Sequence, residues 1–198
     1  WERWKGSSWT KVGDLNAQSY GAGAAGISNT SGIVFAGAPT PDDSNAVKTE
    51  SWNGTAWTEL NELNTGGPQP GGCGIQTAAL CINGEGDEGV ESWNGTVWTE
   101  IADNSNGDRR GSVAAGTYTD AIVYGGGNPS RITKTEKWDG SSWTELADMS
   151  TATQYAGGGG QSSSFAINYG GATPSNPTNS AATEEWTTDH VIKTVTTS

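Results

Sequence analysis

The chain has 198 residues, among them 30 glycines and 10 tryptophans, and its 22 acids and 10 bases give a net charge of −12. This length suits one domain with its own core, and the tryptophan content argues against disorder. The charge makes nucleic acid and anionic membranes poor partners, and no apolar run approaches the roughly 20 residues that cross a bilayer. With one histidine and two cysteines, we expect no metal and no cofactor.

The first predicted element is a strand pair around two tryptophans, and it recurs along the chain. The copies are ERWKGSSWTK from Glu2, ESWNGTAWTE from Glu50, ESWNGTVWTE from Glu91, EKWDGSSWTE from Glu136 and a half copy from Glu184. Asn-Gly or Asp-Gly between the tryptophans of three copies predicts a tight hairpin. The first tryptophans stand at positions 4, 52, 93, 138 and 186, and a period of about 45 residues is typical of β-propeller blades.

A second recurring element lies between these hairpins. It is a Gly/Ala-rich stretch followed by a short apolar run that ends in glycine, such as GIVFAGA and AIVYGGG. Small residues suit crowded inner strands around a central channel, and no segment shows a helical period. The fold class is therefore all-β, a β-propeller of four-stranded blades.

The strand count leaves the ring incomplete. We expect a single domain over 1–198, with repeats at about 1–15 (outer strand pair only), 16–63, 64–104, 105–149 and 150–198. Three arrangements fit: about five blades with one incomplete, a fragment of a larger ring, or completion by a neighbouring chain. The sequence begins with Trp1 and not Met, which fits either loss of a leader or a piece of a longer polypeptide.

The double glycines Gly125-Gly126 and Gly170-Gly171, each followed by a tryptophan strand, resemble kelch-type repeats. The ESWNGTxWTE phrase is similar to the kelch-like repeats of structural and tail proteins of marine phages. The chain departs from the kelch pattern where tryptophan replaces the usual tyrosine, and where Gly37-Ala38 and Gly84-Glu85 lack the second glycine. The resemblance implies the propeller fold, and functions vary widely across that fold.

Acids that recur in every repeat are expected to be structural, because a catalytic group needs one asymmetric place. We expect the glutamates two before each first tryptophan to face solvent or the neighbouring blade: Glu2, Glu50, Glu91, Glu136 and Glu184. Asp14, Asp103 and Asp148 are expected to bond backbone amides after the last strand. No nucleophile or phosphate-loop motif is present, so we expect no catalytic residues and no enzyme.

The two cysteines, Cys73 and Cys81, fall on the two arms of one predicted hairpin. If the turn centres near Thr77, they face each other and permit a cross-strand disulfide; two buried thiols are the alternative.

Binding is expected on the face that carries the long, unequal loops, because function concentrates in loops on a rigid scaffold. The candidate contact residues there are Tyr20, Arg109, Arg110, Arg131 and Tyr155. A rival surface consists of Trp57, Trp98 and Trp143, whose rings would stack on sugars if exposed and build the core if buried.

These patterns predict a non-enzymatic structural or adhesive module, extracellular or in a virion tail or fibre. Its partners would be neighbouring proteins, a second copy of the chain or a receptor, with no nucleic acid and no membrane insertion. The alternatives are a carbohydrate-binding lectin with repeated tryptophan sites and, with less support, a glycan-active enzyme, for which a paired acid–base constellation is missing.

Overall fold

The computed structural model describes residues 2–40, 46–84, 87–127, 129–174, 180–187 and 193–194. Every regular element in these ranges is a β-strand. No helix that is long and apolar enough to cross a membrane occurs in them. The all-β prediction is confirmed.

The strands form a two-stranded sheet, called here the half-blade, and four four-stranded antiparallel sheets, blades 1 to 4. The half-blade consists of β1 (Glu2–Trp4) and β2 (Trp9–Lys11). Blade 1 consists of β3 (Gly23–Ser28), β4 (Ser31–Phe35), β5 (Thr49–Trp52) and β6 (Trp57–Glu59). Blade 2 consists of β7 (Gly71–Ile75), β8 (Ala78–Gly84), β9 (Asp87–Trp93) and β10 (Trp98–Ile101). Blade 3 consists of β11 (Val113–Thr117), β12 (Asp120–Tyr124), β13 (Thr135–Trp138) and β14 (Trp143–Glu145). Blade 4 consists of β15 (Gly157–Ser162), β16 (Phe165–Tyr169), β17 (Thr183–Trp186) and β18 (Lys193–Thr194).

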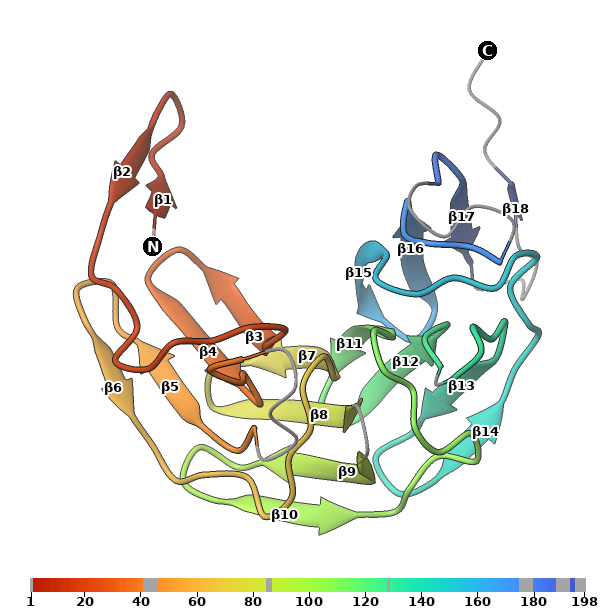
Figure 1. The fold of residues 1–198 in the computed structure, drawn as a ribbon, viewed down its shortest axis with the longest axis horizontal. Coiled ribbons are helices and arrows are strands. Elements are labelled where there is room, and N and C mark those ends of the chain that lie inside the picture. The colour runs from red at the N-terminus through yellow and green to blue at the C-terminus, as the bar shows by residue number, and fades with distance from the viewer. Residues whose placement is uncertain are drawn as a thin grey trace.

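The blades follow one another around a common centre, which confirms the propeller arrangement (Figure 1). The first strand of each blade faces the centre, and β3, β7, β11 and β15 contact one another in that order. A gap separates the half-blade from blade 4, so the ring is an open arc (Figure 1). The half-blade is the incomplete repeat that the sequence predicts.

Close approach of the inner strands requires their small residues. A Cβ added at Gly72 would stand 2.8 Å from the backbone nitrogen of Ala24 in the neighbouring blade, which no side chain tolerates. A hollow of about 400 Å³ lies along these strands. The glycine-rich stretches are therefore explained by crowding at the centre of the arc.

The tryptophan hairpins form as predicted. Trp52 pairs with Trp57 across the turn, and Asn53 Oδ1 accepts hydrogen bonds from the amides of Thr55 and Ala56, both at 2.9 Å. Gly54 supplies the positive φ of +93° that the turn needs. The same pairing recurs for Trp93 with Trp98 and Trp138 with Trp143.

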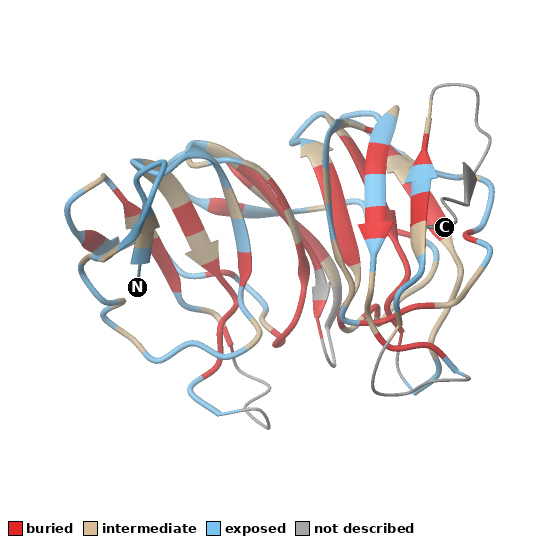
Figure 2. Cartoon of the chain, turned by 90° about the horizontal axis from the view of Figure 1, so that it is seen from above, coloured by how far each residue is buried: buried red, intermediate tan, exposed pale blue. Residues whose placement is uncertain are grey.

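The core lies between blades, in three clusters of buried side chains. At the first interface, Ile33 and Phe35 of blade 1 pack against Trp93 and Trp98 of blade 2. Phe35 meets the Trp98 ring edge-on, with centroids 5.0 Å apart. Burial alternates along the strands accordingly (Figure 2), so apolar mass from each second strand meets tryptophans of the next blade.

The repeated glutamates of the complete blades are buried, so of the two predicted orientations, toward solvent or toward the neighbouring blade, the first is wrong. Glu50, Glu91, Glu136 and Glu184 are between 1% and 5% exposed. Glu91 accepts hydrogen bonds from the amides of Asn64 and Thr65, at 3.0 and 2.9 Å, in the connection that enters its blade. Each carboxylate thus anchors the chain crossing between blades, which satisfies backbone donors that would otherwise be buried without partners.

The acids after the fourth strands differ from blade to blade. Asp103 Oδ1 accepts a hydrogen bond at 3.2 Å from the amide of Val90, which lies in the third strand, β9, and not after the last strand as predicted. Asp148 instead pairs with Lys134 at 3.4 Å and accepts from the hydroxyl of Thr133, and Asp14 pairs with Lys11 at 3.5 Å. Asp14 and Asp148 thus form ion pairs with Lys11 and Lys134.

Cys73 and Cys81 are not joined by a disulfide, so the thiol alternative holds. The turn lies at Gln76 and Thr77, which sets Cys73 opposite Leu80 and Cys81 opposite Gly72. A shift of one residue turns a side chain to the other face of a sheet. Cys73 therefore packs toward blade 3 and Cys81 toward blade 1.

Candidate contact surface

The connections of each blade emerge on two distinct faces. The turns between first and second strands lie beside the tryptophan turns, with Gly54 next to Thr30, Gly95 next to Thr77 and Gly140 next to Thr119. We call this the turn face. The second-to-third connections and the links between blades emerge on the opposite side, the loop face (Figure 2).

A chain of backbone hydrogen bonds runs along the loop face where the chain enters each blade. The amide of Gln69 donates to the carbonyl of Gly21 at 2.6 Å, that of Gly111 to Gln69 at 2.8 Å, and that of Tyr155 to Gly111 at 2.9 Å. All four residues have a positive φ, between +58° and +69°. We call this row the entry ring.

Two members of the entry ring, Gln69 and Tyr155, are not glycine. A left-handed backbone costs such residues free energy, and such positions concentrate at functional sites. A Cβ at Gly111 would stand 2.5 Å from Cδ1 of Tyr155, and one at Gly21 would stand 2.4 Å from Cγ of Gln69. The glycines therefore make room for the side chains of their neighbours.

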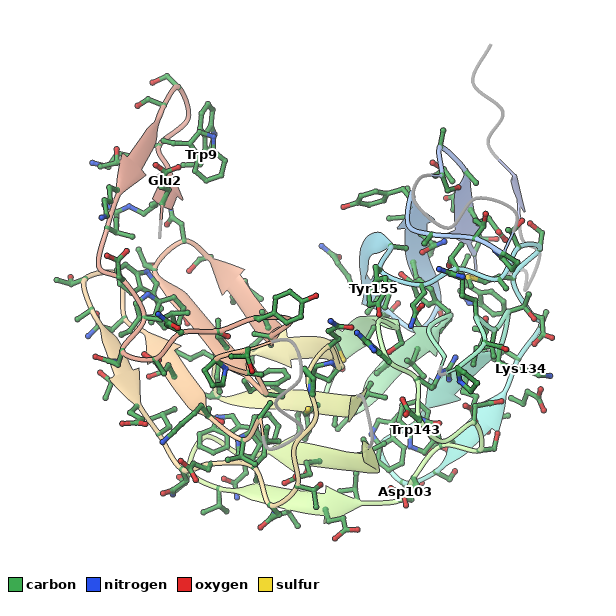
Figure 3. The ribbon with its side chains drawn as sticks, viewed as in Figure 1. Glu2, Trp9, Asp103, Lys134, Trp143 and Tyr155 are labelled. Carbon is green, nitrogen blue, oxygen red and sulfur yellow. The ribbon has the colours of Figure 1, made fainter. Side chains whose placement is uncertain are left out.

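Arg110 lies between these two side chains. Its Nε donates to Gln69 Oε1 at 2.7 Å, and its guanidinium stands 5.8 Å from the centroid of the Tyr155 ring. Gln154 Nε2 donates to the carbonyl of Arg110 at 3.0 Å and fixes the backbone. Arg110 is half-buried and Tyr155 is 47% exposed, so the pair presents a positioned cation and an aromatic ring to a partner. Tyr155 lies toward the inner side of the arc, near β15 (Figure 3).

Tyr20 and Arg131, the other predicted loop-face residues that are not fully buried, lie beside Ala38 and Gly127. Tyr20 is 45% exposed and pairs through its backbone with Ala38 in blade 1. Arg131 is half-buried, next to Gly127, whose amide donates to the carbonyl of Arg110 at 3.2 Å. The Nε of Arg131 is shielded from solvent and has no hydrogen-bond partner within the described ranges.

Arg109 is fully buried, so its prediction as a surface contact is wrong. Its Nη1 donates to Glu136 Oε2 at 2.9 Å, and its Nε and Nη2 donate to the carbonyls of Gly125 and Lys134. Burial lowers the pKa of Arg109 to about 10, while Glu136 and Asp148 act in the opposite direction. Arg109 thus reinforces the glutamate anchor of blade 3.

Two of the three tryptophans of the rival surface, Trp57 and Trp98, are buried, and the third, Trp143, is half-buried. Trp57 is 8% exposed and Trp98 is 5% exposed, and Trp98 Nε1 donates to the hydroxyl of Thr49 in the preceding blade at 3.0 Å. Trp143 is half-buried on the outer rim near Asp103 (Figure 3), and its Nε1 donates to the carbonyl of Ala102 at 2.8 Å. A sugar could not stack on Trp57 or Trp98, because both rings are buried.

The described side chains include no group of three or more His, Cys, Asp or Glu that could hold a metal ion. His190 and the acids Glu85 and Asp189 lie outside the described residues. What the loop face offers in the described ranges is hydrogen bonding, a cation and aromatic contact.

The sequence reasoning missed Gln69 and Gln154, the two buried amides that hold Arg110. Gln69 occupies the entry position where blades 1 and 3 have Gly21 and Gly111, and that exchange of glycine for a larger residue was the available signal. Aligning the repeats on the residues that enter each blade, and not on their tryptophans, would have shown that Gln69 replaces a glycine.

The comparisons with known proteins support the fold. No family model and no curated protein matches this chain. A solved structure described as "Structure of YjhT" matches with a TM-score of 0.76 and 15% identity, over 96% of this chain and 72% of that one. At that identity the similarity shows the fold alone, a β-propeller arrangement, and more than a quarter of the matching chain has no counterpart here.

Proposed function

We propose that this chain is a non-enzymatic structural or adhesive propeller module that contacts a neighbouring protein or a receptor through its loop face. Its setting would be a virion tail or fibre, or an extracellular surface assembly, in line with the resemblance of its repeats to kelch-like repeats of phage structural proteins. The observation that carries the proposal is the Arg110–Tyr155 pair, held on the left-handed entry ring. Aromatic and arginine side chains are those on which protein interfaces most depend.

The repeated residues support a structural role. The buried tryptophans join blades, and the buried glutamates anchor the connections between blades. Neither of these buried sets is exposed for chemistry, whereas the Arg110–Tyr155 pair occurs at one place among the described residues. A contact surface needs only such a positioned and partly exposed group.

The test compares two tyrosines of equal exposure on opposite faces. Tyr155 and Tyr118 are each 47% exposed, and Tyr118 lies in a turn of the turn face. Labelled chain would be applied to a panel of immobilised proteins and to a glycan array. We expect retention on protein, at least a tenfold loss for Tyr155→Ala or Arg110→Ala, and no loss for Tyr118→Ala.

Three results would overturn this proposal: no retention on any protein, equal loss for Tyr118→Ala and Tyr155→Ala, or retention confined to glycans. The last result would favour the lectin alternative. Because Trp57 and Trp98 are buried, such a lectin would bind at the half-buried Trp143 or at a site outside the predicted tryptophan surface.

A further inference from the structure

A lysine bridges two acids at the outer edge of blade 1. Lys48, in the connection that leads into β5, places its Nζ 2.9 Å from Glu59 Oε1 and 2.6 Å from Glu62 Oε1. These three side chains line a groove of about 820 Å³, and Gly95 and Thr96 of the tryptophan turn of blade 2 line it as well. The two acids therefore stand beside the next blade and hold one ammonium group between them.

The same arrangement recurs in blade 3. Lys134 Nζ pairs with Glu145 and lies 3.4 Å from Asp148 Oδ2. In both blades the lysine stands two positions before the buried glutamate, and the acids stand two and five positions after the second tryptophan. Two blades thus show what a pair of acids at these positions holds, which is the ammonium of a lysine.

Blade 2 has the two acids without the lysine. Glu100 and Asp103 occupy the acidic positions and both are exposed, but Gly89 stands where blades 1 and 3 have lysine. Asp103 accepts a hydrogen bond from the amide of Val90, and in the described ranges neither acid pairs with a lysine or an arginine. Blade 2 therefore carries the acceptors of this arrangement and not its donor.

An aromatic ring stands beside these two acids. Trp143, the second tryptophan of blade 3, is half-buried, and its Nε1 donates at 2.8 Å to the carbonyl of Ala102, in the segment between the acids (Figure 3). Its counterpart Trp98 is 5% exposed and donates instead to the hydroxyl of Thr49. Val90 has the place of that threonine in blade 2 and offers no hydroxyl, so the indole of Trp143 bonds to the outer segment. The face of an indole ring attracts a cation, as the carboxylates do.

We propose that Glu100, Asp103 and Trp143 form a docking site for a lysine side chain of a partner protein. Its ammonium takes the position that Lys48 and Lys134 occupy in blades 1 and 3, and its methylene stem lies against the indole ring. The net charge of −12 favours a basic partner. The site lies at the outer edge of blades 2 and 3 and not on the loop face, so its test does not depend on the proposed function.

The test follows the indole N–H signal of Trp143 by NMR in isotope-labelled chain, where Trp143→Phe identifies the signal by removing it. The probe is N-acetyl-lysine methylamide, and the neutral N-acetyl-norleucine methylamide is the control. We expect a saturable shift with the lysine probe and none with the norleucine probe. Binding should be in the millimolar range, because a single exposed ion pair and a single cation–π contact each contribute little.

Matched variants of blades 1 and 2 test which residues bind the probe. Glu100→Gln should weaken binding about two- to fivefold. Glu59→Gln is the control and should leave binding unchanged, because Lys48 already occupies that site. Gly89→Lys, within strand β9, supplies the lysine from the chain itself and should abolish the shift.

Four results would overturn the proposal. They are no saturable shift with the lysine probe, an equal shift with the norleucine probe, equal weakening by Glu59→Gln and Glu100→Gln, and undiminished binding to folded Gly89→Lys. If Gly89→Lys does not fold, Glu100→Gln combined with Asp103→Asn replaces it, because both changes remove a charge and keep the shape of the side chain. Undiminished binding to that double variant would overturn the proposal equally.

Discussion

Arg109 Nη1 lies 2.9 Å from Glu136 Oε2, and both side chains are buried, at 0% and 1% exposure. The matching glutamate of blade 2, Glu91, accepts its bonds from Asn64 and Thr65. Removing one partner of a buried ion pair leaves a charge without compensation, which usually costs about 3–5 kcal/mol. The loss of hydrogen bonds to a charged group costs about 1.5–3 kcal/mol.

We therefore predict that Glu136→Gln lowers the free energy of unfolding by more than Glu91→Gln. Urea denaturation of the two variants measures the difference directly. Equal losses would mean that Arg109 contributes nothing beyond the amide bonds common to the blades.

The same repeat position gives opposite predictions in different blades. Trp98 is buried between blades and Trp9 is exposed on the half-blade. Trp98→Ala should cost about 3–5 kcal/mol of unfolding free energy, the range of large buried aromatics. Trp9→Ala should change it by less than about 0.5 kcal/mol. A large loss for Trp9→Ala in thermal or urea unfolding would show that the half-blade is packed in solution.

Much of the fold could be predicted from the sequence, because its local signals agree with one another. Trp52-Asn53-Gly54 combines a turn dipeptide with strand residues, and the structure has the predicted hairpin there. The spacing of the tryptophans predicted where the blades repeat. The unequal number of outer and inner strands predicted that one blade is incomplete. These features depend on short segments, which a sequence displays directly.

The candidate site was harder to predict because it depends on contacts between distant segments. Nothing local distinguishes Arg109, which is buried against Glu136, from Arg110, which reaches Tyr155. Cys73 and Cys81 show a related difficulty, since a turn placed one residue away moves a side chain through the sheet. The repeated glutamates are buried because the connections between blades pass over them. The path of those connections cannot be predicted from the local sequence.

The pH dependence of stability should reflect Asp139 in the tryptophan turn of blade 3. Bonds from the backbone of Ser142 and from Ser141 lower the pKa of Asp139 from 3.8 to about 2. Because the folded pKa is depressed, the stabilisation is present above pH 3.8 and is lost as the pH falls toward 2. Asp139→Asn keeps a hydrogen-bond acceptor in the turn, because Asn53 and Asn94 occupy the same position in blades 1 and 2. The asparagine side chain does not titrate.

Wild type and Asp139→Asn should therefore diverge in unfolding free energy between pH 4 and pH 2, with the variant falling less steeply. Parallel curves across that range would contradict the account of this turn.

Both thiols should be unreactive in the folded chain. Cys73 and Cys81 are each 6% exposed, and burial raises the pKa of Cys73 to about 12. A thiol reagent at pH 8 should modify neither cysteine in native protein and both in denatured protein, because the thiolate is the reactive form. A change in mass on reduction alone would instead reveal a disulfide.

The open end of the arc is the central claim, and amide hydrogen exchange followed by mass spectrometry tests it most directly. The account predicts rapid exchange over β1, residues 2–4, and strong protection over β5 and β13, which pair on both edges. Protection of β1 equal to that of β5 and β13, in the isolated chain, would contradict it.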